Sequence, residues 1–144
     1  ICTFNKKMKN RSYDLIQMRP HIEKIKSFEN MSRQEVFQNK TLRPILKLQN
    51  QLLLEIFRDY IITRKGTFYN LNNLNRLDYI EKNITKDQKF QNSIKGIIIG
   101  HFTIDEYQIY NQDISSINKR IINLAIDRLK DQVEYFINRL TIHN

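Results

Sequence analysis

The sequence is poor in cysteine, glycine, proline and alanine, and it contains no tryptophan. The one cysteine, Cys2, cannot form a disulfide within the chain, which excludes a disulfide-stapled scaffold and a zinc site built on several thiolates. Three glycines and two prolines exclude a collagen-like chain, and the glycines form neither a P-loop nor a dinucleotide fingerprint. No apolar run reaches the roughly 18 residues of a membrane-spanning helix, and residues 1–11 lack the apolar centre of a secretory signal. We therefore expect a soluble protein that does not enter a membrane, in the cytoplasm.

The residues that are present suit one globular domain. Of 144 residues, 40% are hydrophobic and 27% are charged, which is enough to build a core. The net charge is +9, and it is spread along the chain: residues 1–31 carry seven basic and three acidic residues, and residues 32–144 carry 17 and 12. We predict a basic N-terminal extension over 1–31, partly helical or disordered, and a single helical-bundle domain over 32–144. The diffuse charge leaves weak, salt-sensitive binding to nucleic acid open as an alternative function.

Capping motifs predict several helix starts. Ser32 is followed by Glu35 and Thr103 by Glu106, the spacing at which a hydroxyl and a carboxylate satisfy the first amides of a helix. Thr85 with Gln88 predicts a third start. Asn73 or Asn75, and Asp113, are candidate caps for two further helices, and Thr41 for the helix that accepts Pro44 in its first turn.

Apolar residues recur every three or four positions in long segments. One stripe over residues 42–64 contains Ile45, Leu48, Leu52, Ile56 and Tyr60, and it is widened by Leu53 and Phe57. Gly66 is placed to end that helix in a left-handed conformation. Further helices are predicted from the following apolar positions: Leu74, Leu77, Ile80 and Ile84; Phe90, Ile94, Ile97 and Ile98; and Ile117, Ile121, Leu124, Ala125, Leu129, Val133, Phe136 and Leu140. Residues 15–28 add an amphipathic stretch around Pro20. The predicted fold is all-α, a compact bundle of four to five helices with an N-terminal extension. A small hairpin at 60–69 and a strand at 96–100 are the competing interpretations.

One group of residues has the chemistry of a metal site. His101 precedes Asp105 and Glu106 by four and five positions, and an imidazole with carboxylates can bind zinc, iron or nickel. The capping interpretation competes, because it places Glu106 opposite Thr103 and Asp105 in the positive first turn of a helix. His101 and Glu106 are therefore only weak candidate metal ligands. No catalytic residues and no cofactor are predicted.

Three polar residues fall on or beside apolar helix faces, namely Gln49, Asp87 and Arg128. If they are buried they must be paired, since an unpaired buried charge is strongly unfavourable. Asp87 with Arg43, Arg120 or Arg128 would form a structural ion pair. The alternative is a ligand pocket lined by these groups.

Phe68 and Tyr69 follow a basic loop, Arg64-Lys65-Gly66-Thr67, and so resemble part of an RNA-recognition strand. Stacking on a nucleic-acid base is one interpretation of these aromatics. The other is that both side chains fold back to cover the end of the bundle.

Several segments together resemble a group of short bacterial proteins often labelled glyoxalase. These segments are NKTLRPILKLQNQLL at 39–53, TFY at 67–69, KDQ at 86–88 and GIIIGHFT at 96–103, followed by Glu106 and Tyr107. The resemblance implies a metal-dependent lyase acting on a methylglyoxal–thiol adduct, with His101 and Glu106 as the matching ligand types.

The residues themselves favour a different role. The apolar stripes offer more helix surface than one small bundle can bury. We therefore expect a small cytosolic α-helical protein that acts as a non-catalytic protein-binding or regulatory module, whose partner is another protein or a second copy of itself. The glyoxalase-like lyase remains the enzymatic alternative.

Overall fold

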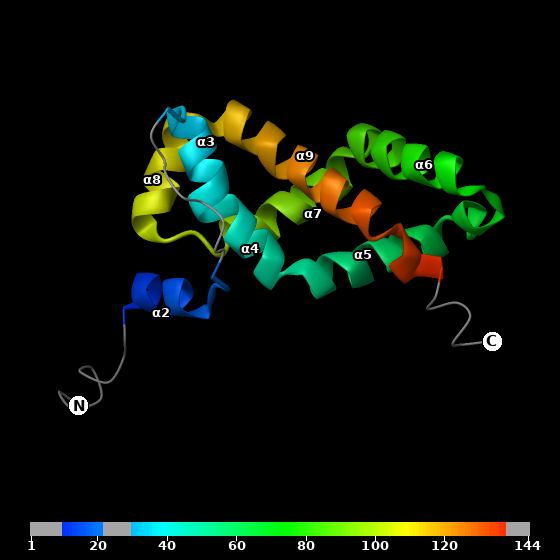
Figure 1. Cartoon of the computed structure of the whole chain (residues 1–144), viewed down its shortest axis with the longest axis horizontal. Helices are drawn as coiled ribbons and strands as arrows, with labels where there is room; N and C mark the ends of the chain where they lie inside the picture. Colours follow the sequence, from blue (N-terminus) through cyan, green and yellow to red (C-terminus); the bar gives the residue numbers. More distant parts are fainter. Residues whose placement is uncertain (1–9, 22–29, 138–144) are drawn as a thin grey trace.

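Figure 1 shows the computed structural model of the chain, in which residues 10–21 and 30–137 are described. This part of the chain is helical and contains no strand, so the all-α prediction is confirmed. It contains eight α-helices rather than four or five. Their bounds are α2 (Arg11–Met18), α3 (Arg33–Phe37), α4 (Arg43–Leu48), α5 (Asn50–Thr63), α6 (Asn73–Lys86), α7 (Gln88–Ile99), α8 (Ile104–Gln112) and α9 (Ile114–Asp131), with a π-helical segment η1 (Gln38–Leu42) and a 3-10 segment η2 (Thr67–Asn70).

Three helices carry most of the core. The long helices α5 and α9 run along opposite sides of the molecule, and α7 lies between them (Figure 1). Helix α7 packs on α9, α6 contacts both, and α8 and η1 pack against α9. None of the helices in the described ranges is both long and apolar enough to cross a membrane.

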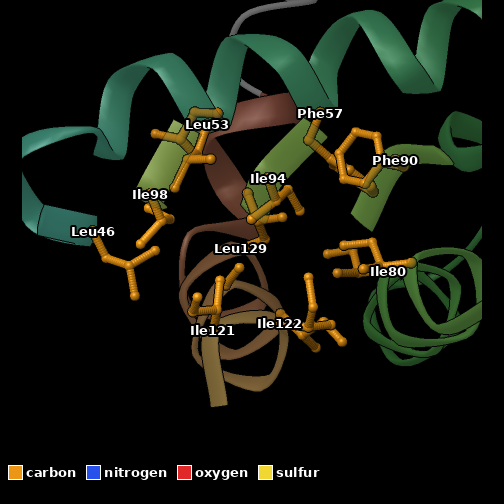
Figure 2. Close-up of a cluster of buried hydrophobic side chains, with 14 of the residues drawn as sticks. Leu46, Leu53, Phe57, Ile80, Phe90, Ile94, Ile98, Ile121, Ile122 and Leu129 are labelled. Carbon is orange, nitrogen blue, oxygen red and sulfur yellow. The ribbon is translucent and has the colours of Figure 1, made fainter. Parts of the chain in front are cut away.

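The core is a layer of aliphatic and aromatic side chains between these helices. In Figure 2, Leu53 and Phe57 of α5 face Ile94 of α7, with Ile121 and Leu129 of α9 on the other side. Phe57, Ile94 and Ile121 are almost completely buried. Burial of each such side chain is worth about 1.5–3 kcal/mol, so this layer is the main stabilising feature of the fold.

The apolar stripes are confirmed in part. Phe90, Ile94 and Ile98 form the buried face of α7, as the spacing predicts. Leu52 and Leu74, however, are exposed. In α5 the buried face runs through Leu53, Phe57 and Tyr60, all part of the predicted stripe, because this side faces α7, whereas the edge of the stripe at Leu52 does not.

Three predicted helix starts are correct. The hydroxyl of Ser32 accepts a hydrogen bond from the amide of Glu35 (3.2 Å). Thr103 and Glu106 form a reciprocal capping box, with bonds of 3.1 and 2.8 Å. Asp113 is the cap residue of α9, but its side chain does not bond to the helix amides.

Two other predicted starts are wrong by a few residues. Helix α6 begins after Asn72, whose side chain accepts from the amide of Asn75 (2.9 Å). Helix α6 continues through Thr85, and Asp87 caps α7 by accepting from the amide of Phe90 (2.9 Å). A carboxylate is a stronger acceptor than a neutral hydroxyl, so Asp87 is the better cap.

The predicted helix over 42–64 is instead part of a longer, interrupted run that begins at Arg33. Pro44 lies inside this run, and proline has no N–H for the carbonyl four residues earlier and clashes with it. The chain widens there into η1, where the amide of Arg43 reaches back to the carbonyl of Gln38. The run breaks again at Gln49 (φ −94°, ψ 9°). Thr41 is therefore buried within the π-helical segment and is not a cap.

Gly66 adopts the predicted left-handed conformation, φ +64°. Lys65 before it is left-handed too, φ +62°, and the amides of both residues bond to carbonyls of the last turn of α5. This closure leads directly into η2, and residues 96–99 belong to α7. The hairpin and strand interpretations are therefore wrong.

The two ends of the described chain differ from the predicted lengths. The extension contains helix α2, and part of the predicted amphipathic stretch, residues 22–28, lies outside the described residues. Helix α9 ends at Asp131, and a further helical turn covers 133–137. Leu140 lies outside the described residues.

Candidate functional site

Glu106 has the densest set of polar contacts of the candidate residues. Its Oε1 accepts from Nη2 of Arg19 (2.6 Å) and from the amide of Thr103 (2.8 Å). Its Oε2 accepts from Nη1 of Arg19 (2.7 Å) and from the hydroxyl of Thr41 (2.8 Å). The side chains of Arg19 and Glu106 are only 8% and 13% exposed. All four contacts come from the protein, so the carboxylate is committed to holding three segments together.

The electrostatics of Glu106 agree with this role. Burial raises its pKa, but the hydrogen bonds from Arg19, the Thr103 amide and Thr41 outweigh burial, so the pKa lies below its ordinary value. The residue is therefore ionised at neutral pH and cannot serve as a proton donor there.

Arg19 and Arg11 attach α2 to the connection between α7 and α8. Arg11 donates to the carbonyls of Phe102 and Gly100, each at 2.8 Å, and Arg19 donates to the carbonyl of His101 (2.8 Å). Helix α2 itself buries no residue. Polar contacts therefore fix its position.

His101 contacts the break between α4 and α5. Its Nε2 contacts Nε2 of Gln49. Burial lowers the pKa of His101, and the charges of Arg19 and Arg11 lower it further. The imidazole is thus neutral near pH 7, with Nε2 available to accept a hydrogen bond from the Gln49 amide.

These contacts assign His101 and Glu106 to different neighbours. In the described part of the chain, no group of three His, Cys, Asp or Glu side chains is arranged to hold a metal ion. Glu106 is bonded to Arg19, Thr103 and Thr41, whereas His101 contacts Gln49.

Asp87 has a structural role at the junction of α6 and α7. Besides capping α7, it forms an ion pair with Arg64 (2.6 Å). The predicted partners Arg43, Arg120 and Arg128 do not pair with it, because Arg64 follows the end of α5 beside this junction. Arg128 instead donates a long hydrogen bond to Asn50 (3.3 Å).

Phe68 is completely buried and packs edge-on against Tyr79 and Phe136. Tyr69 is partly buried and also contacts Phe68. The two residues cover the end of the bundle, and Phe68 has no ring face available for stacking on a base.

An open groove of about 890 Å³, which no sequence pattern predicts, lies at the opposite end. Helices α2, α3, α8 and α9 enclose it together with η1. Its apolar side chains are Ile16, Met31, Val36, Phe37, Ile109 and Ile117. No local pattern reveals such a groove, because each helix supplies only one or two of these residues.

The fold and these contacts define an all-helical protein in which the candidate ionisable residues have structural roles and an apolar groove remains. Comparison of the chain with protein-family models, curated proteins and solved structures gives no match. The resemblance to the glyoxalase-labelled proteins therefore gains no support from a family model.

Proposed function

We propose that this chain is a non-catalytic protein-binding module whose groove between α3 and α8 receives the apolar face of a helix from a partner protein. The observation that carries the proposal is the groove itself, lined by aliphatic side chains from several helices. Amphipathic helices bind such grooves through anchors on one face.

The polar groups of the groove narrow the chemistry of the partner. Thr41 and Glu106 are bonded to each other, which leaves aliphatic side chains to provide most of the contact. Arg33 and Lys40 lie on the α3–η1 wall, and Asp105 on the α8 wall. A partner helix with acidic residues along one flank of its apolar face and basic residues along the other would match both walls.

The neighbouring surface extends the apolar area. Ile104, Tyr107 and Ile109 of α8 are each about half exposed. Isolated exposed apolar residues are ordinary, but several on one helix beside an apolar groove are typical of an interaction surface.

The test uses a fluorescent synthetic helix with a leucine stripe, flanked by glutamate on one side and lysine on the other. Fluorescence anisotropy should show binding to the full chain, with no binding of a scrambled peptide of the same composition. Ile109→Asp should abolish binding, and the matched control Leu74→Asp, at an exposed site on α6, should leave it unchanged. Equal binding by the Ile109→Asp protein would refute the groove as the site.

A second copy of the chain is the other possible source of the helix. Light scattering over a concentration series distinguishes it: a dimer that Ile109→Asp dissociates identifies self-association, and a monomer identifies a separate protein.

A further inference from the structure

A second pocket, of about 440 Å³, lies on the other side of η1, between this segment and α9. Unlike the groove it is polar. Its lining residues are Gln38, Arg43, Ser116, Lys119, Arg120, Asn123, Leu124 and Asp127. Three of these are cations and one, Asp127, is a carboxylate.

The cations of this pocket are not neutralised by nearby carboxylates. Within residues 10–21 and 30–137, no ion pair at 4 Å or less includes Arg43, Lys119 or Arg120. Arg120 is held by neutral acceptors instead, the side-chain oxygens of Gln38 (2.7 Å) and Gln34 (3.4 Å). The guanidinium is therefore positioned while its positive charge stays available.

A further arginine adds to the local positive charge. Burial lowers the pKa of Arg128, the charge of Arg43 lowers it further, and the charge of Asp131 acts in the opposite direction. Arg43 uses its Nε in a bond to Asn39 (2.8 Å), so its two terminal nitrogens remain for a ligand. Like charges held together in a concave site favour an anion between them.

Neutral donors complete the site. The hydroxyl of Ser116 and the amide of Asn123 line the same pocket, and Gln38, whose oxygen is occupied by Arg120, has its amide nitrogen left to donate. Guanidinium groups bind the oxygens of a phosphoryl group through paired hydrogen bonds. We propose that this pocket binds the phosphoryl group of a small phosphate or phosphate monoester.

The experiment titrates inorganic phosphate and glycerol phosphate into the full chain at constant ionic strength, with calorimetry as the readout. Arg43→Gln and Lys119→Gln should each weaken binding about tenfold, as expected for loss of one charged hydrogen bond. Lys86→Gln is the control: it makes the same change of net charge, but on the last turn of α6, outside the pocket lining. Because a distant charge is screened by salt, this variant should change the phosphate affinity less than about twofold. Circular dichroism verifies that each variant is folded.

Asp127→Asn gives a result that a structural role would not produce. Removing the carboxylate that lines the pocket should strengthen phosphate binding several-fold. Tighter binding of glycerol phosphate than of phosphate identifies an ester as the ligand, and equal binding identifies the free ion.

Three outcomes would overturn the proposal. One is an absence of binding by both probes, and another is an equal loss of affinity in Lys86→Gln, which would indicate diffuse charge only. The third is tighter binding of a short single-stranded DNA than of either probe, which would assign the cations to nucleic acid.

Discussion

Replacing Glu106 with Gln should release α2 from the rest of the protein while the core stays folded. Glutamine can keep the capping box, because its oxygen can still accept from the amide of Thr103. Its NH₂ group, however, would face the Nη1 donor of Arg19, where the carboxylate now accepts at 2.7 Å. The substitution therefore removes the ion pair and preserves the helix start.

The magnitude follows from the burial of the pair. Removing one partner of a buried ion pair costs about 3–5 kcal/mol. Helix α2 buries no residue, so few apolar contacts oppose its departure. Release would also return conformational entropy to the helix, and it would break only a few hydrogen bonds: two from Arg11, one from Arg19 to the carbonyl of His101, and one from the amide of Ile104 to the hydroxyl of Ser12. Local release of α2 is thus less costly than leaving Arg19 buried without its partner.

Hydrogen exchange measures this release directly. In Glu106→Gln the amides of α2 should exchange at least about tenfold faster, and those of α9 should change little. Glu35→Gln is the matched control, since Glu35 occupies the same position after the Ser32 cap but is exposed. Unchanged exchange in α2 of the Glu106→Gln protein would refute the conclusion that this ion pair holds the helix.

Acid should have the same effect as the substitution. The pKa of Glu106 is lower in the folded protein than in the unfolded chain, so folding stabilises the ionised form. The contribution is complete above the unfolded pKa and is lost as the pH falls through the lower folded value. In the Glu106→Gln protein, that part of the acid sensitivity of α2 should be absent.

Three further substitutions test the fold. Lys65→Gly should raise the free energy of unfolding by about 1 kcal/mol, because the backbone of Lys65 is left-handed (φ +62°). Gly66→Ala should lower the free energy of unfolding by at least that amount, because the backbone there is also left-handed and the new Cβ would lie 3.3 Å from the Tyr69 ring. Thermal unfolding of both variants measures these changes. Asp87→Ala should lower stability by about 1 kcal/mol through loss of the α7 cap, with peptide and phosphate binding unchanged; a loss of binding at full stability would instead give Asp87 a ligand role.

The helix starts that the sequence predicts correctly depend on local contacts. Ser32 and Thr103 bond to amides three residues away, so the pattern contains both partners. The same kind of local pattern predicts a cap at Thr85, but the observed cap of α7 is Asp87, two residues later. Helix type and approximate position are therefore predictable, and the exact cap is not.

Distant contacts, in addition to Pro44, accompany the interruptions of the run that begins at Arg33. Thr41 has the spacing of a cap before Pro44, but its hydroxyl donates to Glu106, 65 positions later. Gln49 lies where α4 gives way to α5, beside His101. Neither contact leaves a periodic signal, so a continuous helix is the natural prediction from the stripe alone.

The pairing of Asp87 shows the same limit and explains the second pocket. Sequence placed Asp87 among three possible arginine partners, and the fold gives it a fourth, Arg64. Within the described residues this leaves Arg43, Arg120 and Arg128 without a carboxylate at ion-pair distance. A carboxylate from Asp87 would have neutralised one of these arginines, so the phosphate site that we propose between η1 and α9 depends on the pairing of Asp87 with Arg64.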